Sequence, residues 1–269
     1  MAGESIVVGD VTLNHVIDGD PGKPWLILSN SLATDHRMWR PQIEMLTATH
    51  RVLRYDTRGH GVSSVPQGPY DFDMLVGDVV AMMDALQIDT ATFMGLSLGG
   101  MTSLGLALDH ADRIDAIICC DGRADAPDIY KQMWPQMISR ARENGMSGVA
   151  EQTITRWFSE AFRDDPDNVS VLVSTADMIR ETPVEGYAGC AGALLGLDYL
   201  PRLGEIAVPS LYVVGEHDPA APADVMRDMA QRTPGSEFAM IPGAAHLSNL
   251  ENPQRFNAIV ATWLAEHQA

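Results

Sequence analysis

The sequence predicts an α/β fold in which a mostly parallel central sheet is flanked by helices and carries an inserted helical cap. Short aliphatic or β-branched runs alternate with helical patterns over the first part of the chain, and the alternation resumes near the end. Apolar strands separated by helices are typical of a parallel sheet that is covered on both faces. Between the two alternating parts, the chain shows helical patterns and no convincing strand.

The expected elements follow in a regular order. The first is a hairpin, "SIVVGDVTLNHVIDG", whose turn is Gly9-Asp10. The runs expected as later strands are "WLILSN", "RVLRYD", "TATFMG", "DAIICCD", "VPSLYVVGEHD" and "SEFAMIPG". Helices are expected at about residues 36–48, 73–86, from 98 onward, 223–231 and 253–266. The strand–helix–strand steps imply right-handed crossovers in one sheet.

The helical stretch divides the chain into a core and an insertion. It contains "IYKQMWPQMISRARENG" and "VAEQTITRWFSEAF", which have helical patterns. We expect residues 1–122 and 200–269 to form the core and residues 123–199 to form the helical cap.

Composition and charge limit the function. The chain of 269 residues has 36 acidic and 18 basic side chains, a formal charge of -18 and a pI near 4.6. This charge repels nucleic acid and anionic membranes, so we expect neither as a partner. The N-terminus lacks a secretion signal and no long apolar run is present, which favours a cytoplasmic protein. Three cysteines without ligand spacing indicate reduced packing residues.

The stretch "FMGLSLGGM" contains a serine where an apolar run changes to a helical pattern. "GLSLG" matches G-x-S-x-G, in which a sharp strand-to-helix turn exposes the serine hydroxyl. A Cβ at Gly95 or Gly99 would collide with such a tight turn. The pattern is weak alone, but the strand-like "TATFM" before it and the helical spacing after it provide the required context. We therefore expect Ser97 to be a nucleophile rather than a helix-capping serine.

A serine nucleophile needs a base, an acid that orients the base, and donors for the oxyanion. His246 follows the last predicted strand and Asp218 follows the strand before it, so both lie at carboxyl ends of parallel strands. Asp121 also follows an apolar strand and is the alternative acid. The backbone N–H of Leu98, directly after the serine, is the first expected oxyanion donor.

The motifs resemble a known family. "DTRGHGVS", "GLSLGG", "GEHDPAAP" and "GAAH" occur in the order found in the α/β-hydrolase superfamily. "LSNSLATDHRMW", "LRYDTRGHGVSS" and "TPVEGYAGCAGAL" are similar to bacterial 3-oxoadipate enol-lactonases of the β-ketoadipate pathway. "DGRADAPDIYKQMW", which leads into the cap, departs from the alanine-rich sequence of those lactonases.

The resemblance implies a catalytic triad of Ser97, Asp218 and His246, because "GEHD" matches the family pattern better than the segment of Asp121 does. It also implies that Leu32, in the loop "SNSLAT", supplies the second oxyanion N–H. We expect no metal and no organic cofactor, since no ligand pattern is present.

Substrate contacts are expected in the cap. Trp134 and Met137 lie on a helical face that either lines the pocket or packs inside the cap. A carboxylate-bearing lactone would need a cationic anchor. The candidates are Arg123, Lys131 and Arg140.

Three hypotheses for function follow. The first is a serine hydrolase that cleaves a small ester or lactone, with 3-oxoadipate enol-lactone as the leading substrate. The second is a carbon–carbon bond (meta-cleavage product) hydrolase or a perhydrolase with the same triad. The third is a ligand sensor on the same fold. The sequence leaves the oligomeric state open, and a homo-oligomer is compatible with it.

Overall fold

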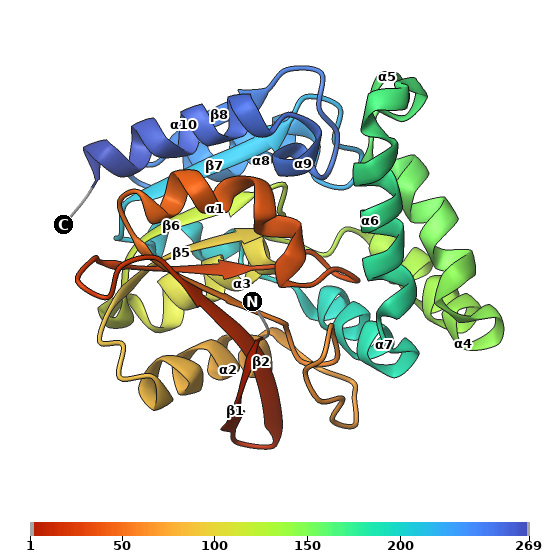
Figure 1. The fold of residues 1–269 in the computed structure, drawn as a ribbon, viewed down its shortest axis with the longest axis horizontal. Helices are drawn as coiled ribbons and strands as arrows, with labels where there is room; N and C mark the ends of the chain where they lie inside the picture. Colours follow the sequence, from red (N-terminus) through yellow and green to blue (C-terminus); the bar gives the residue numbers. More distant parts are fainter. Residues whose placement is uncertain (1–2, 268–269) are drawn as a thin grey trace.

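A computed structural model of the chain, which describes residues 3–267, contains an eight-stranded sheet flanked by helices (Figure 1). This architecture confirms the α/β prediction. Residues 1–2 and 268–269, at the ends of the expected core segments, lie outside the described residues. The strands are β1 (Glu4–Val8), β2 (Val11–Asp18), β3 (Trp25–Ser29), β4 (Arg51–Tyr55), β5 (Ala91–Leu96), β6 (Ile114–Cys120), β7 (Ser210–Gly215) and β8 (Glu237–Ile241).

The strand order β1-β2-β4-β3-β5-β6-β7-β8 brings the expected functional segments to one edge of the sheet. β1 and β2 form the expected antiparallel hairpin, in which Val8 pairs with Val11 across the Gly9-Asp10 turn. β2 pairs antiparallel with β4, and all later pairs are parallel. The carboxyl ends of β3 to β8 therefore meet at the same edge, where ligands bind in open α/β sheets.

Helices cover both faces of the sheet, as the fully buried strands β5 and β7 require. In Figure 1, α1 and α10 lie on one side of the sheet, and α2 and α3 lie on the other. The helices of the core are η1 (His36–Trp39), α1 (Arg40–Thr47), α2 (Phe72–Ala85), α3 (Leu98–Asp109), η2 (Ala111–Arg113), η5 (Leu200–Glu205), α8 (Ala223–Arg232), α9 (Ser248–Glu251) and α10 (Pro253–Glu266).

Side chains at the helix ends explain several of these boundaries. The Asp71 carboxylate accepts a hydrogen bond from the Met74 N–H at the start of α2. Asn252 caps α10 in the same way, and Pro253 occupies the first helical position, where its missing N–H costs nothing. Both helices begin within one residue of their predicted starts.

Between β6 and β7 the chain forms a separate group of helices beyond the sheet edge (Figure 1). Two hydrogen bonds hold the ends of this segment side by side, from the Tyr199 N–H to the Ala124 carbonyl (2.7 Å) and from the Ala126 N–H to the Leu197 carbonyl (2.9 Å). We therefore propose that residues 123–199 form a cap inserted into the core. Its helices are α4 (Asp128–Trp157), α5 (Glu160–Asp164), η3 (Pro166–Asn168), α6 (Val169–Glu181), α7 (Val184–Ala193) and η4 (Leu194–Gly196).

The longest cap helix, α4, changes direction at Gly145. This residue has a φ of 72° within an otherwise helical segment, a backbone conformation that glycine adopts without a steric penalty. The two halves of α4 therefore run in different directions, and each contributes side chains to the space between cap and core.

The cap contacts the core through two glycines. Gly59, in the loop after β4, has a φ of 76°, and its backbone lies directly against Gly186 in α7. A Cβ on Gly186 would overlap the Gly59 carbonyl group, so the two backbones approach as closely as they do only because neither residue has a side chain.

No helix in residues 3–267 combines the length and the apolar composition needed to cross a membrane. The three cysteines are unpaired and buried, which agrees with packing roles.

We predict that Gly186→Ala lowers the free energy of unfolding by about 1–3 kcal/mol, because the added methyl group forces the cap away from Gly59. Urea denaturation measures this change. Gly148→Ala is the matched control. Gly148 is exposed in α4, and a Cβ there would meet Asn144 Cβ at an ordinary 3.8 Å, so alanine should change stability by less than about 1 kcal/mol in either direction. If Gly186→Ala were as stable as wild type, the contact between Gly59 and Gly186 would not depend on the absence of a side chain at Gly186.

Candidate active site

Ser97 occupies a strained turn between β5 and α3. Its φ of 54° lies in the left-handed region that non-glycine residues rarely adopt. The Ser97 N–H donates to the Cys120 carbonyl (2.8 Å), which fixes the turn to β6. A Cβ at Gly95 would overlap backbone atoms of Gly99, and a Cβ at Gly99 would overlap backbone atoms of Ser29. Only glycine therefore fits at these two positions. The turn has the geometry that "GLSLG" predicts.

His246 and Asp218 form a hydrogen-bonded pair at the same sheet edge. The His246 Nδ1 atom lies 2.8 Å from the Asp218 Oδ2 atom, and both side chains are buried. Asp218 is itself held by the Ala220 N–H, which donates to its Oδ1 atom (2.7 Å). A carboxylate that accepts from Nδ1–H leaves Nε2 as the basic nitrogen. The Ser97 hydroxyl has no hydrogen-bond partner among residues 3–267, as is common for a catalytic serine without substrate.

Asp121, the alternative acid, is engaged elsewhere. One of its carboxylate oxygens accepts from the Gly215 N–H (2.8 Å) and the other from the Ser248 hydroxyl (2.5 Å). Burial and the nearby negative charge of Asp218 raise the pKa of Asp121 well above its usual range. Of the two aspartates, Asp218 is therefore the one placed to orient His246.

The two expected oxyanion donors, Leu32 and Leu98, belong to the turn after β3 and to the start of α3. Leu98 is the first residue of α3, where backbone N–H groups have no intrahelical acceptor. Leu32 lies in the turn after β3, which the Thr34 N–H closes by donating to the Ser31 carbonyl (3.1 Å). Within residues 3–267 neither the Leu32 nor the Leu98 N–H donates to another group. Both amides are therefore available to an oxygen bound beside Ser97.

His60 holds the Leu32 turn in place. Its Nε2 atom accepts a hydrogen bond from the Ala33 N–H (2.9 Å), and its Nδ1 atom lies 3.1 Å from the Arg58 carbonyl. Burial lowers the pKa of His60, so the imidazole stays neutral and keeps its acceptor nitrogen toward Ala33. Ala33 has a φ of 62°, and this contact helps to maintain that unusual conformation.

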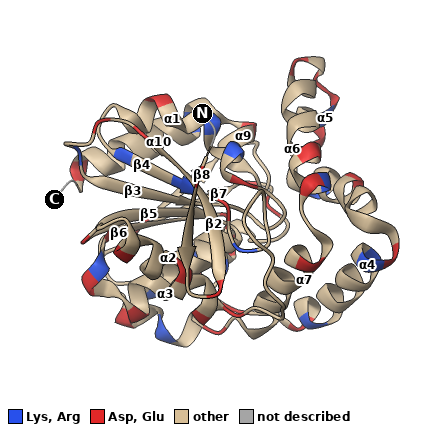
Figure 2. Ribbon diagram, turned by 60° about the horizontal axis from the view of Figure 1, so that its bottom comes forward, with Lys and Arg blue, Asp and Glu red and all other residues tan. Residues whose placement is uncertain are grey.

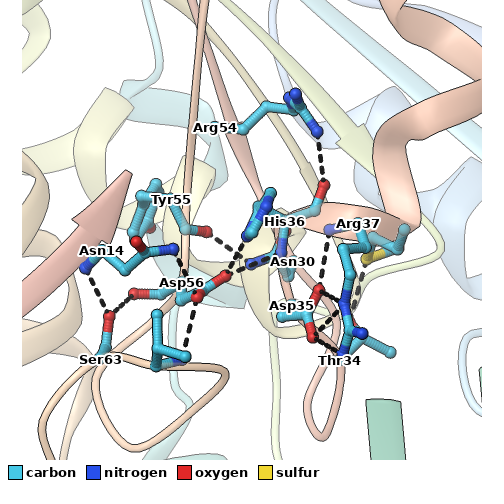
Figure 3. Close-up of polar contacts among 12 residues, drawn as sticks. Asn14, Asn30, Thr34, Asp35, His36, Arg37, Arg54, Tyr55, Asp56 and Ser63 are labelled. Atoms are coloured by element: carbon cyan, nitrogen blue, oxygen red, sulfur yellow. Dashed lines mark hydrogen bonds and ion pairs between the residues drawn. The ribbon is translucent and has the colours of Figure 1, made fainter. Parts of the chain in front are cut away.

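A second polar cluster lies behind the same loop (Figure 3). Asp35, His36 and Asp56 bring three potential metal-ligand atoms close together. Their atoms are already engaged, because Asp56 accepts from the His36 N–H and lies 2.7 Å from its Nδ1, while Asp35 accepts from Arg37. Asn30 donates to the Tyr55 carbonyl (2.7 Å) in the same region. We assign this cluster to support of the loop rather than to metal binding.

Ser97, His246 and Leu32 open into a cavity of about 250 Å³ between core and cap. Its volume suits a small substrate. Core residues form one side, and cap residues form the other. The cap residues that line it are Ile129, Tyr130, Met133, Trp134, Thr153, Arg156, Trp157, Tyr187 and Leu194.

The expected substrate contacts divide into two groups. Trp134 lines the cavity, whereas Met137 and Arg140 line a second groove, the outer groove, formed by the two halves of α4. Arg156 lies between the two and lines both. Arg123 pairs with Asp125 (2.9 Å) outside the cavity, because its guanidinium turns back along its own loop.

Lys131 is also outside the cavity, exposed and 3.6 Å from the Asp128 carboxylate one helical turn away. The cationic residue that does line the cavity is Arg156, which the sequence analysis missed. The bend of α4 at Gly145 decides which side chains face inward, and nothing in the sequence fixes its direction.

Acidic positions occur on both the core and the cap, and Lys and Arg positions are scattered among them (Figure 2). The net charge of -18 means that an anionic substrate approaches against the overall field. The Arg156 side chain in the cavity wall therefore places a positive charge where the overall charge of the protein is negative.

Comparisons with known proteins identify the family of the chain. A model of the alpha/beta hydrolase fold family matches residues 24–253. The chain is 37% identical over 258 residues to 3-oxoadipate enol-lactonase 2 of Acinetobacter baylyi, which covers 96% of this chain and 94% of the relative.

Two solved structures are similar along nearly the whole chain. The enol-lactonase from Burkholderia xenovorans LB400 superposes with a TM-score of 0.93 at 38% identity, over 97% of this chain and 100% of that one. A thermophilic esterase from Thermogutta terrifontis gives a TM-score of 0.91 at 28% identity, over 100% of both chains. The chain therefore belongs to the α/β-hydrolase family, as an ester-hydrolysing enzyme similar to the 3-oxoadipate enol-lactonases.

Proposed function

We propose that the protein is a serine hydrolase that opens a small lactone through an acyl-serine intermediate, with 3-oxoadipate enol-lactone as its substrate. The observation that carries this proposal is one cavity shared by Ser97 at its strained turn, by His246 held by Asp218, and by the Leu32 turn. Similarity to enol-lactonases over nearly the full chain supports the choice of substrate.

The first half of the reaction acylates the enzyme. Ser97 Oγ attacks the ring carbonyl carbon while His246 Nε2 accepts the hydroxyl proton, and Asp218 stabilises the resulting imidazolium. The negative charge on the carbonyl oxygen is stabilised by the N–H groups of Leu32 and Leu98. The ring C–O bond then breaks, and His246 returns the proton to the departing enol oxygen. An enol is a better leaving group than an ordinary alkoxide, which makes this step easier.

The second half releases the product. His246 removes a proton from a water molecule, and the resulting hydroxide attacks the acyl carbon. The same two amides stabilise the second oxyanion. When the intermediate collapses, the bond to Ser97 breaks and His246 protonates Ser97 Oγ, which leaves a free carboxylic acid. Conversion of the enol to the ketone makes the ring opening hard to reverse.

We predict that Ser97→Ala removes turnover of 3-oxoadipate enol-lactone, because no other group in the mechanism attacks the carbonyl. The measurement is loss of the ultraviolet absorbance of the lactone with purified protein. The fold should remain intact by circular dichroism, and retention of most activity would disprove the role of Ser97. If wild type cleaves simple aryl esters but not the lactone, the serine mechanism stands and the substrate assignment does not.

We predict that Asp218→Asn lowers kcat by about 10³- to 10⁴-fold, because an amide no longer holds His246 in the required tautomer. Asp121→Asn is the matched comparison, since Asp121 bonds to Gly215 and Ser248 rather than to His246, and it should lower kcat by less than about tenfold. Steady-state kinetics on one substrate measures both variants. An equal or larger loss in the Asp121 variant would assign the orienting role to Asp121.

A further inference from the structure

We propose that Arg156, together with Tyr187 and Trp134, binds a carboxylate group of the substrate and makes the enzyme select anionic lactones and esters over neutral ones. The inference rests on the proposed function, because it names the class of substrate that the same cavity takes. Arg156 acts in it as a specificity-determining residue, separate from the triad and the oxyanion donors.

Arg156 lies at a helix end that is attached to the His246 loop. It lies in the last turn of α4, next to Trp157, and both residues line the cavity. The Leu247 N–H donates to the Trp157 carbonyl (3.2 Å), and the Trp157 ring lies 5.8 Å from the His246 ring, measured between centroids. This end of the cap helix is therefore attached to the loop that carries the catalytic base.

A further contact strengthens the attachment. The Glu251 carboxylate accepts hydrogen bonds from the Ser159 N–H (3.1 Å), just after α4, and from the Ala245 N–H (2.8 Å), just before His246. One side chain thus joins the cap to the His246 loop. A group that is bound by Arg156 is consequently positioned relative to His246 with little freedom.

Arg156 has no anionic partner in the part of the chain that the structure describes. Its Nε atom is buried without a hydrogen-bond acceptor, and its Nη1 atom lies 3.8 Å from the sulfur atoms of Met133 and Met137. Two buried arginines of the core are paired, Arg58 with Asp78 (2.7 Å) and Arg54 with Asp18 (2.6 Å), whereas Arg51, which also has an unpaired Nε, lies over the Trp25 ring. A buried guanidinium N–H without an acceptor is costly, and a ligand carboxylate removes that cost.

Two more residues that line the same cavity carry an unpaired donor. The Tyr187 hydroxyl and the Trp134 Nε1–H are buried and have no hydrogen-bond partner among residues 3–267. Burial raises the pKa of Tyr187 to about 12, against the opposing effect of the positive charge of Arg156, so the hydroxyl keeps its proton.

The chemistry of these three groups specifies the ligand. The guanidinium and the indole N–H can only donate, and the phenol can donate. An acceptor with two oxygens and a negative charge matches such a set, and the planar guanidinium suits a carboxylate. In a protein with a net charge of -18, this local cation also offsets the repulsion that an anionic substrate meets.

The test compares two esters that differ only at the far end of the acyl chain, 4-nitrophenyl hydrogen adipate and 4-nitrophenyl hexanoate. The measured quantity is the ratio of their kcat/KM values, adipate half-ester over hexanoate ester. We expect Arg156→Met to lower this ratio by about 10- to 100-fold, mainly through KM of the adipate half-ester. Both rates come from one sample, so partial misfolding of the variant does not change the ratio.

Two further variants make the result specific. Arg156→Lys keeps the charge but loses the planar fork, and it should retain part of the ratio. Arg140→Met removes an arginine from the outer groove, and the ratio should then stay within about twofold of wild type. An unchanged ratio in Arg156→Met overturns the proposal. So does an equal fall in Arg140→Met, because the effect would then come from overall charge.

A binding measurement separates this proposal from the proposed function. Adipate is titrated calorimetrically into wild type and into Arg156→Met. If Ser97→Ala still hydrolyses the esters, the serine mechanism fails, and the titration then tests the anchor alone. Adipate binding that is at least about tenfold weaker in Arg156→Met supports the anchor. Equal binding to both proteins overturns it.

Discussion

The strained turn at Ser97 is the constraint on which the rest of the site depends. A serine with a φ of 54° is unfavourable by itself, and it persists because the surrounding backbone leaves no alternative. The Ser97 N–H bonds to β6, the Gly99 N–H donates to the Asn30 carbonyl (3.1 Å) after β3, and both flanking glycines contact backbone directly. The same packing brings the Leu32 turn and Ser97 to one cavity, so the strain at Ser97 and the position of the proposed oxyanion donor have one cause.

The cap depends on a small number of direct connections to the core. Gly59 and Gly186 let two backbones touch, and Glu251 bridges the end of α4 to the His246 loop. Arg37 adds a charged contact, since its guanidinium pairs with Asp35 in the core and with Glu181 in the cap. Because these contacts surround the cavity, a shift of the cap would change substrate contacts and catalytic geometry together.

The charged side chains on the core side of the cavity differ from the one on its cap side in their hydrogen-bond and ion-pair partners. On the core side, both carboxyl groups are hydrogen-bonded within the protein, since Asp218 contacts His246 and Asp121 accepts from Gly215 and Ser248. On the cap side, the charge of Arg156 is not compensated by any described carboxylate within 4.0 Å. In the proposal made above, the negative charge of the substrate pairs with Arg156 on the cap side.

The sequence by itself determined the fold class, the order of the elements and the residues of the expected triad, because apolar periodicity, turn residues and short catalytic motifs are local signals. The hairpin at Gly9-Asp10 and the turn at Ser97 follow from such signals. Only the tertiary structure decided which cap side chains reach the cavity. Met137 and Arg156 both belong to α4, yet with the bend at Gly145 and the attachment of Trp157 Arg156 reaches both the cavity wall and the outer groove, whereas Met137 lines the outer groove alone. Which side chains face the cavity depends on contacts between segments that are distant in the sequence, and a local sequence pattern does not indicate such contacts.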